Sequence, residues 1–346
     1  MNSFGRIFRV SILGESHGDR VGILIDGCPA GIHLNNDDFT KDIERRKPGA
    51  KGTTPRKEDD IPEIISGVFN ERTTGTPITI LFKNSNTRSA DYEKQRAIPR
   101  PGHADFVASK KFDGFEDYRG GGHFSGRLTV ALVAAGVVAK KILNPISAFS
   151  GGKKELFQGG ITVNASILEI GGEADIEKGL QRAIDAKDTI GGIVECRVKN
   201  LAIGLGEPFF DSAESLISHA VFAIPAVRGI EFGTGFASAR MFGSVHNDAI
   251  ESMDGTTTTN HSGGIVGGLT NGNELVFRIA IKPTSSTPKE QQTLNIETGN
   301  VEPFSVKGRH DLCIALRVPV VLEAVTAMVL VDLFMTDHKI NRVITQ

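Results

Sequence analysis

Two histidines that lie beside glycine are the residues of this sequence best suited to acid–base chemistry. His17 lies within Gly-Glu-Ser-His-Gly at 14–18, and His103 lies within Arg-Pro-Gly-His-Ala-Asp at 100–105. An imidazole, whose unperturbed pKa is ~6.5, can donate or accept a proton near neutral pH. Arg100 adds a forked donor set for phosphate or carboxylate, and Asp105 could orient the ring of His103. Each histidine alone could also be a structural or surface residue.

Three further segments combine groups that suit an anion. Residues 119–127 read Arg-Gly-Gly-Gly-His-Phe-Ser-Gly-Arg before an expected helix, and the first N–H groups of a helix bind anions. Residues 282–286 place a lysine beside three hydroxyls, and residues 308–311 read Gly-Arg-His-Asp. The first segment lacks the lysine and hydroxyl of a nucleotide-binding phosphate loop, and no Gly-x-Gly-x-x-Gly follows an expected strand. Nucleotide hydrolysis and a Rossmann cofactor site are therefore disfavoured.

Composition narrows the class of protein. The chain has 39 basic and 41 acidic residues, for a net charge of −2, whereas a dedicated nucleic-acid binder would have a strong basic excess. Aromatic residues make up 6% and tryptophan is absent, so stacking platforms for single strands are scarce. The three cysteines form no Cys-x-x-Cys pair, which indicates neither a zinc site nor a disulfide framework and suits a reducing compartment.

No segment resembles a targeting or membrane-spanning sequence. The N-terminus lacks an uninterrupted apolar core followed by a small-residue cleavage site. Residues 130–139 are too few to span a bilayer, and residues 318–334 contain Glu323 and Asp332. We therefore expect a cytoplasmic protein that binds neither membrane nor nucleic acid.

The candidate chemical groups lie at the ends of expected strands and helices. Strands at 6–13 and 21–26 would present the loop that carries His17. A largely apolar helix at 127–143 would follow the glycine-rich segment, and a second one at 318–335, apolar on most faces, would be buried.

The remaining elements complete a mixed pattern of helices and strands. The segment 84–126 is a long connection with little periodicity, and long ordered loops are usually functional. Without repeats or an obvious linker, the sequence predicts one integrated α+β domain over residues 1–346. The other expected elements are a short helix running toward Arg46, helices at 173–187 and 212–223, and strands at 76–82, 192–203, 227–232, 239–245 and 274–282.

These motifs, in this order, resemble the chorismate synthase family over nearly the whole chain. The resemblance implies conversion of 5-enolpyruvylshikimate-3-phosphate to chorismate and phosphate, an anti-1,4-elimination that needs reduced FMN without net redox change. It also implies helices packed between two antiparallel sheets, and a homotetramer. The matching segments are 14–31, 100–105, 119–127, 203–208, 260–268, 282–286 and 308–311, together with Glu323.

The resemblance also implies roles for individual residues and no metal site. His17 would supply a proton to reduced flavin, His103 would assist the departing phosphate, and Asp311 would lie near flavin N5. Substrate phosphate and carboxylates would be held by Arg46, Lys51, Arg100 and Arg127, with Arg309 serving both ligands. The flavin site would be lined by His123, Phe124, Ser125, Ala226, Gly267, Lys282, Pro283, Thr284, Ser285, Ser286 and Arg309.

Three positions depart from the family pattern. Lys51 is the only basic candidate where many relatives have a second arginine, and lysine lacks the bidentate fork. His123-Phe124 replaces the common Arg-Ser, and Pro225 replaces an asparagine found in some relatives. None of these positions is a proposed proton-transfer residue.

The source of electrons and two other functional classes remain to be distinguished. The sequence has no recognisable nicotinamide motif, so NAD(P)H is expected only as an indirect source through an external flavin reductant. A flavin-dependent oxidoreductase with net electron transfer is the main alternative, and it would consume stoichiometric reductant. A phosphate- or RNA-binding module is the non-enzymatic alternative, and its affinity would depend steeply on salt.

Overall fold

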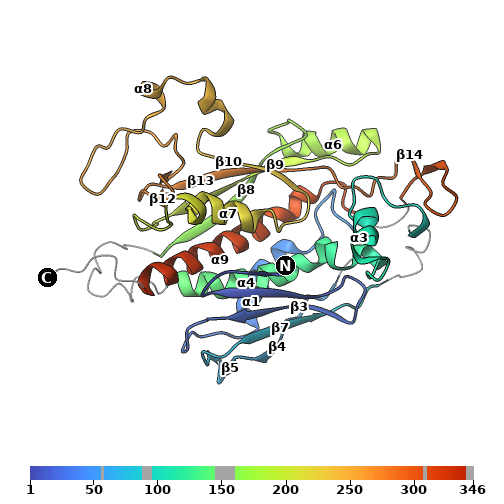
Figure 1. Cartoon of the computed structure of the whole chain (residues 1–346), viewed down its shortest axis with the longest axis horizontal. Helices are drawn as coiled ribbons and strands as arrows, with labels where there is room; N and C mark the ends of the chain where they lie inside the picture. The colour runs from blue at the N-terminus through green and yellow to red at the C-terminus, as the bar shows by residue number, and fades with distance from the viewer. Residues whose placement is uncertain (56–57, 88–95, 145–159, 307–309, 340–346) are drawn as a thin grey trace.

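Two antiparallel sheets, with helices between them, make up the computed structural model, which describes residues 1–55, 58–87, 96–144, 160–306 and 310–339 (Figure 1). The first sheet has the strand order β1-β2-β3-β7-β4. Its strands are β1 (Ser3–Phe4), β2 (Arg9–Gly14), β3 (Arg20–Asp26), β7 (Ile78–Lys83) and β4 (Glu63–Ser66). The mixed α+β class predicted from the sequence is confirmed.

Alternation along β3 and β7 decides which face of this sheet meets the helices. Val21, Ile23 and Ile25 are fully buried, and each lies opposite a buried apolar residue of β7. Because side chains alternate between the two faces of a strand, a shift of one residue would turn all of them to the other face. The apolar pattern therefore fixes the register that holds the His17 loop at the end of β2.

The second sheet has the strand order β10-β13-β9-β8. Its strands are β10 (Val227–Phe232), β13 (Leu275–Ile281), β9 (Gly192–Lys199) and β8 (Thr162–Ile170). Three small ribbons lie outside the main sheets: β5–β6 (Val68–Phe69 and Arg72–Thr73), β11–β12 (Ile265–Val266 and Leu269–Thr270) and β14–β15 (Gln291–Leu294 and Val301–Phe304).

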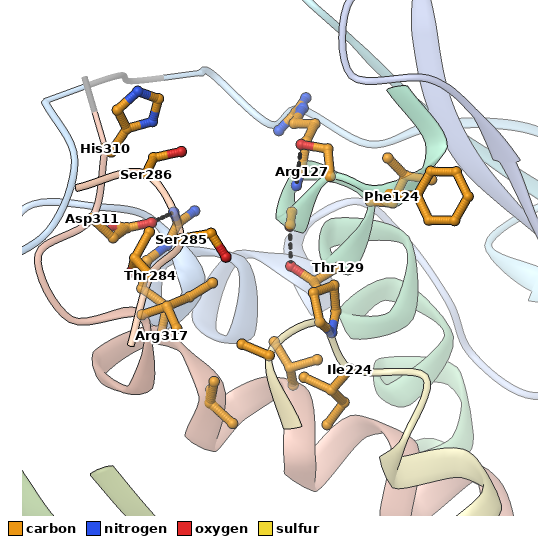
Figure 2. Close-up of a pocket in the computed structure, with 18 of the residues that line it drawn as sticks. Phe124, Arg127, Thr129, Ile224, Thr284, Ser285, Ser286, His310, Asp311 and Arg317 are labelled. Atoms are coloured by element: carbon orange, nitrogen blue, oxygen red, sulfur yellow. Dashed lines mark hydrogen bonds and ion pairs between the residues drawn. The ribbon is translucent and has the colours of Figure 1, made fainter. Parts of the chain in front are cut away.

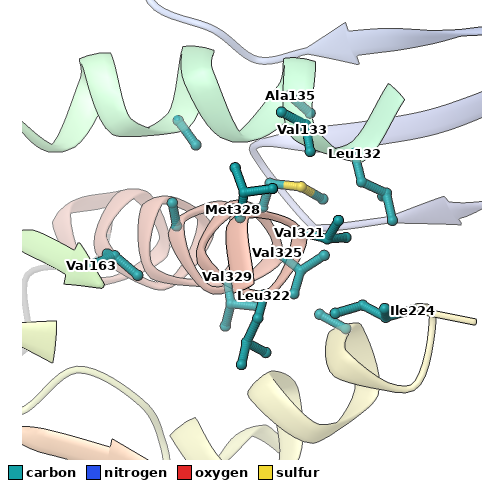
Figure 3. Packing of buried hydrophobic residues seen from close by; sticks show 14 of the residues in the cluster. Leu132, Val133, Ala135, Val163, Ile224, Val321, Leu322, Val325, Met328 and Val329 are labelled. Atoms are coloured by element: carbon teal, nitrogen blue, oxygen red, sulfur yellow. The ribbon is translucent and has the colours of Figure 1, made fainter. Parts of the chain in front are cut away.

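Helices α4 (Thr129–Leu143) and α9 (Val318–Lys339) pack against each other between the sheets (Figures 1 and 3). A Cβ added at Gly136 of α4 would lie 2.3 Å from that of Ala324 in α9, so glycine permits this close approach. Of the described residues, Ile314–His338 is the one stretch long and apolar enough to cross a membrane, but 78% of its most apolar window is buried. Burial on this scale is typical of a core helix, which is what the sequence predicted.

Buried carboxylates attach α9 to its surroundings. Glu323 accepts hydrogen bonds from Arg45 (2.7 Å) and Lys140 (3.0 Å) and from the backbone N–H of Ala165 (3.0 Å). Asp332 accepts from the backbone N–H groups of residues 6–8 at 2.7–3.0 Å. These contacts join α9 to α1 (Asp37–Arg46), α4, β8 and the N-terminal segment.

Some local predictions were wrong. The expected strand at 239–245 instead contains the end of a 3₁₀ helix, η6 (Gly235–Arg240), and the start of α8 (Gly243–His246). Phe242 and Val245 are exposed there, and none of the strands that the structure describes pairs with this segment. The connection 84–126 includes α3 (Asp105–Phe112) and η2 (Arg119–Phe124), and β8 and β14–β15 were not predicted.

The other helices were largely expected. The predicted helices at 173–187 and 212–223 correspond to α6 (Ile176–Ala186) and α7 (Ala213–Val221). The remaining short 3₁₀ helices are η3 (Gly126–Leu128), η5 (Phe209–Asp211) and η7 (Ile314–Arg317).

Candidate active site

A cavity of about 510 Å³ lies where the ends of α1, α4 and α9 meet the loops at 100–104, 282–286 and 310–317. This volume is in the range of small-ligand sites. Asp311, Arg317 and the hydroxyls of Thr284–Ser286 lie on one side, and Phe124, Arg127 and Thr129 lie on the other (Figure 2). The cavity therefore brings together segments that are far apart in the sequence.

His103 lines the cavity, and Asp105 and Arg100 orient it. Its Nδ1 lies 2.6 Å from Oδ1 of Asp105. Arg100 donates to both oxygens of this carboxylate, from Nε to Oδ2 at 2.7 Å and from Nη2 to Oδ1 at 2.8 Å. Although burial opposes ionisation, hydrogen bonds from Arg100 and His103 hold the pKa of Asp105 well below its usual value. An ionised carboxylate can only accept, so Nδ1 donates to it and Nε2 can exchange a proton with a ligand.

Arg46 and Arg127 are joined by a buried carboxylate, Asp60. Oδ2 of Asp60 accepts from Arg46 at 3.2 Å, and Oδ1 accepts from Arg127. Burial and the charge of Arg317 lower the pKa of Arg46 well below its usual value. We infer that Arg46 keeps its charge, because Asp60 and nearby oxygen acceptors surround a guanidinium that does not deprotonate in proteins.

The loop at 282–286 forms a polar cradle against Gly102. The carbonyl oxygen of Gly102 accepts from Nζ of Lys282 (3.0 Å) and Oγ of Ser285 (2.8 Å). Burial and the charge of Arg228 lower the pKa of Lys282. Oγ1 of Thr284 is buried and has no hydrogen-bond partner within the described ranges, and an unmet buried hydroxyl is costly unless a ligand or water completes it.

Asp311 faces this cradle from the start of the last helical segment (Figure 2). Its Oδ1 accepts from the backbone N–H of Thr54 at 2.8 Å, and its Oδ2 accepts from Nη1 of Arg317 at 3.1 Å. Both carboxylate oxygens therefore have a fixed donor, and the group is held in one orientation at the cavity wall.

Comparisons with known proteins agree with the sequence motifs. The family model for chorismate synthase matches residues 8–335. A chorismate synthase of Chitinophaga pinensis is 68% identical over 343 residues, covering 99% of each chain. A chorismate synthase of Dehalococcoides mccartyi (strain BAV1) is 44% identical over 362 aligned positions, covering 100% of each chain. The chain belongs to the chorismate synthase family. Its function is the chorismate synthase reaction, a lyase step of the shikimate pathway that leads to the aromatic amino acids.

A solved structure supports the fold of this chorismate synthase family member. The crystal structure of a chorismate synthase superposes with a TM-score of 0.71 at 24% identity, covering 96% of this chain and 93% of the other. At this identity the likeness concerns the fold, and the family assignment depends on the closer sequence relatives.

Most residues that the chorismate synthase resemblance singled out do line the cavity. They come from six separate segments of the chain, so motifs that are far apart in the sequence come together around one cavity. These residues are Arg46, Arg100, His103, His123, Phe124, Ser125, Arg127, Ala226, Lys282, Pro283, Thr284, Ser285, Ser286 and Asp311.

His17 lies directly behind the cavity wall. It is buried, and a Cβ added at Gly120, which does line the cavity, would lie 2.2 Å from Nδ1 of His17. Oγ of Ser16 is 3.3 Å from the same nitrogen. This imidazole is therefore packed against Gly120, a residue of the cavity wall.

Two other expected residues do not line the cavity. Lys51 is exposed, and its Nζ donates to Oε1 of Gln181 in α6 at 3.0 Å. This placement disagrees with the substrate contact expected for Lys51, because its side chain is directed to the surface. Gly267 lies in the turn between β11 and β12 and does not line the cavity. Arg309 lies outside the described residues.

Sequence reasoning missed three charged residues that line the cavity, Glu58, Asp60 and Arg317. Asp60 lies within a common acidic run and gave no distinct signal. Arg317 directly precedes an apolar helix, where the helix dipole disfavours a cation. A cation at that unfavourable position was the signal that could have identified it.

Proposed function

We propose that the cavity binds reduced FMN beside 5-enolpyruvylshikimate-3-phosphate and carries out the anti-1,4-elimination of phosphate. The observation that carries this proposal is the oriented His103 within a cavity that also contains Arg46, Arg127 and the 282–286 cradle. Reduced FMN, when bound, supplies electron density transiently to the substrate and recovers it as the C–H bond breaks. The protein residues bind the two anions and move the protons.

The residues present fit a flavin phosphate group. Oγ1 of Thr284 lacks a described partner, and Lys282 places a cation beside Ser285 and the backbone of Gly102. Hydroxyl and ammonium donors are the groups that bind phosphate in proteins. Ala226, His123, Phe124 and Ser125 are the further lining residues proposed to contact the flavin.

Three residues carry the proton transfers in this proposal. When both ring nitrogens of His103 carry a proton, Nδ1 donates to Asp105 and Nε2 donates its proton to the leaving phosphate. The carboxylate of Asp311 assists removal of the substrate proton on the flavin side. His17 supplies a proton to the reduced flavin past Gly120, where the absence of a side chain leaves the imidazole close to the cavity.

The substrate phosphate and carboxylates are assigned to the arginine side of the cavity. Arg46 and Arg127 are the proposed contacts, with Arg309 added on the family pattern alone. Arg100 already donates to Asp105 and to Oγ of Ser286, so its main task is to hold His103. We do not assign Lys51 to the substrate.

Assembly, location and the source of electrons complete the proposal. Several large apolar side chains are exposed, among them Phe210, Phe236, Phe242 and Met253. Exposed apolar groups of this kind are typical of surfaces that contact another subunit, which supports a homotetramer. We further propose one integrated domain in the cytoplasm and an external flavin reductant, with NAD(P)H as an indirect electron source.

Replacement of His103 by alanine tests the proton transfer. General acid–base groups contribute roughly 10²–10⁴-fold to rate, so H103A should lose at least about 100-fold in kcat. Its affinity for FMN, measured by flavin fluorescence, should stay within a few-fold of the parent protein. Near-normal turnover by H103A would contradict the role assigned to this residue.

A further inference from the structure

Arg317 is the cavity arginine that none of the family motifs singled out. It ends η7 and lines the cavity wall beside Asp311. Its side chain is 18% exposed, compared with 2% for Arg46 and 5% for Arg100 and Arg127. Of these four guanidinium groups, Arg317 is therefore the most accessible to a ligand.

In the other three arginines, every side-chain nitrogen already makes at least one hydrogen bond to a protein oxygen. Nε, Nη1 and Nη2 of Arg46 each donate to a protein oxygen. The same holds for the three nitrogens of Arg100 and for those of Arg127. Arg317 donates through Nε and Nη1, whereas its Nη2 has no acceptor among the residues that the structure describes.

Two contacts fix the direction of the Arg317 guanidinium. Nε donates to the backbone carbonyl of Arg46 at 2.9 Å, and Nη1 donates to Oδ2 of Asp311 at 3.1 Å. A planar guanidinium anchored at two nitrogens has its third nitrogen oriented in advance. Asp311 and Arg317 face the side of the cavity that carries Arg127 and Thr129 (Figure 2).

The electrostatic surroundings of Arg317 also favour the binding of an anion. It directly precedes α9, where the positive end of the helix dipole disfavours a cation. Next to burial, its charge is the largest influence that lowers the pKa of Arg46. Asp311 is its one carboxylate partner among the described residues, and an incoming oxyanion would relieve the repulsion between the two arginines.

We propose that Arg317 binds a carboxylate or phosphate oxygen of the reacting ligands through Nη2 and orients Asp311 through Nη1. The proposed function supplies the two ligands that could carry this oxyanion, the enolpyruvyl substrate and FMN. The free donor and the charge of Arg317 favour an anion, whichever of the two ligands supplies it. Arg317 is thus a binding residue for the ligand and a positioning residue for Asp311.

Substitution of Arg317 shows which of the two ligands, the substrate or FMN, supplies the oxyanion. Variants R317Q and R317K are compared with R182Q, an exposed arginine of α6 remote from the cavity. A hydrogen bond to a charged group corresponds to roughly 10–100-fold in affinity. If the substrate carries the oxyanion, R317Q raises KM for 5-enolpyruvylshikimate-3-phosphate by that factor, R317K recovers part of it, and R182Q changes nothing.

Flavin binding provides the second arm of the test. If the oxyanion is the phosphate of FMN, the Kd of FMN rises about 10–100-fold in R317Q while that of riboflavin, which has no phosphate, is unchanged. Either pattern supports an oxyanion contact. Folded R317Q with unchanged KM and unchanged FMN affinity overturns it.

The positioning role has its own readout. Nη1 of Arg317 holds Oδ2 of Asp311, so R317Q should lower kcat independently of its effect on KM, and R317K should recover part of kcat. An unchanged kcat in folded R317Q would refute this role.

One measurement is independent of turnover. Calorimetric titration with inorganic phosphate should show weaker binding to R317Q than to R182Q. If the parent protein makes no chorismate but phosphate binding still depends on Arg317, the proposed function fails and this inference stands. If the parent protein turns over and R317Q matches it in every readout, only the inference on Arg317 fails.

Discussion

Nδ1 of His103 lies 2.6 Å from Oδ1 of Asp105, and Arg100 donates to both oxygens of the same carboxylate. The arrangement fixes which ring nitrogen carries the proton. In D105N the amide can present its oxygen or its NH₂ group to Nδ1, and the tautomer is no longer specified. We expect D105N to lose about 10²-fold or more in kcat with FMN affinity nearly unchanged. The exposed D185N is the matched control, and equal kcat in the two variants would contradict the orienting role.

Gly121 is packed against the ring of His103. A Cβ there would lie 2.9 Å from Cε1 of the imidazole, and the residue has φ +81°, so G121A should displace His103 and lower kcat. Gly114 has a similar φ of +77° but open space around the added Cβ, which makes G114A a control for backbone strain alone. Thermal unfolding and turnover are measured for both. A G121A enzyme as active as G114A would show that the contact is unimportant.

Lys51 distinguishes the observed geometry from the family pattern. Its Nζ contacts Gln181 at the surface, so K51Q should change KM for the substrate by less than about 3-fold, because an exposed contact of this kind contributes little. R127Q, which removes a cavity cation, is the positive comparison. A large increase in KM for K51Q would place Lys51 back at the substrate.

Glu323 should make stability depend on pH. Burial raises its pKa, but Arg45, Lys140 and the amide of Ala165 outweigh burial and lower it. A carboxyl with a depressed folded pKa stabilises the protein above its unfolded pKa, about 4.3, and this stability is lost as pH falls through the folded value. E323Q should therefore cost about 3 kcal/mol near pH 7.

The same variant should approach the parent protein only as the pH falls below the lowered pKa of Glu323 in the folded state, where its carboxyl is protonated. Denaturant unfolding at several pH values measures the difference, with the exposed E177Q as control. A pH-independent difference between E323Q and the parent would rule out the ionic contribution.

The three cysteines should resist thiol reagents in the folded protein. Burial raises the pKa of Cys28 and Cys313 to about 11 and that of Cys196 to about 12. Since the thiolate is the reactive form, almost no reaction with a disulfide reagent is expected at pH 8. Three thiols should titrate after unfolding in guanidinium. Rapid labelling of the native protein would show that one of the cysteines is accessible.

Local features of this protein could be predicted from the sequence, and contacts between distant segments could not. The orientation of His103 depends on residues within five positions of it, so the spacing of Arg100 and Asp105 was informative. Asp60 bridges Arg46 and Arg127, and the three residues come from three separate segments. The acidic run that contains Asp60 did not indicate this contact. Helix α9 was identified because it is apolar on nearly all sides, which only a buried position permits.

The incorrect predictions also concern contacts between segments that are distant in the sequence. The side chain of Lys51 could turn toward the cavity or toward α6, and the sequence around it does not distinguish the two. The segment 239–245 has strand-like residues but no partner strand within the described part of the chain. His17 was correctly placed in the loop between two paired strands. Its contact with Gly120 joins residues more than 100 positions apart, which the sequence did not indicate.

The most direct test of the account is an anaerobic assay with 5-enolpyruvylshikimate-3-phosphate, FMN and an amount of dithionite far below that of the substrate. Product formation is measured by the absorbance of chorismate. We expect all of the substrate to become chorismate and phosphate, because the flavin is not consumed. Chorismate formed only in proportion to the added reductant would indicate net electron transfer. No chorismate from folded, flavin-loaded protein would contradict the central claim.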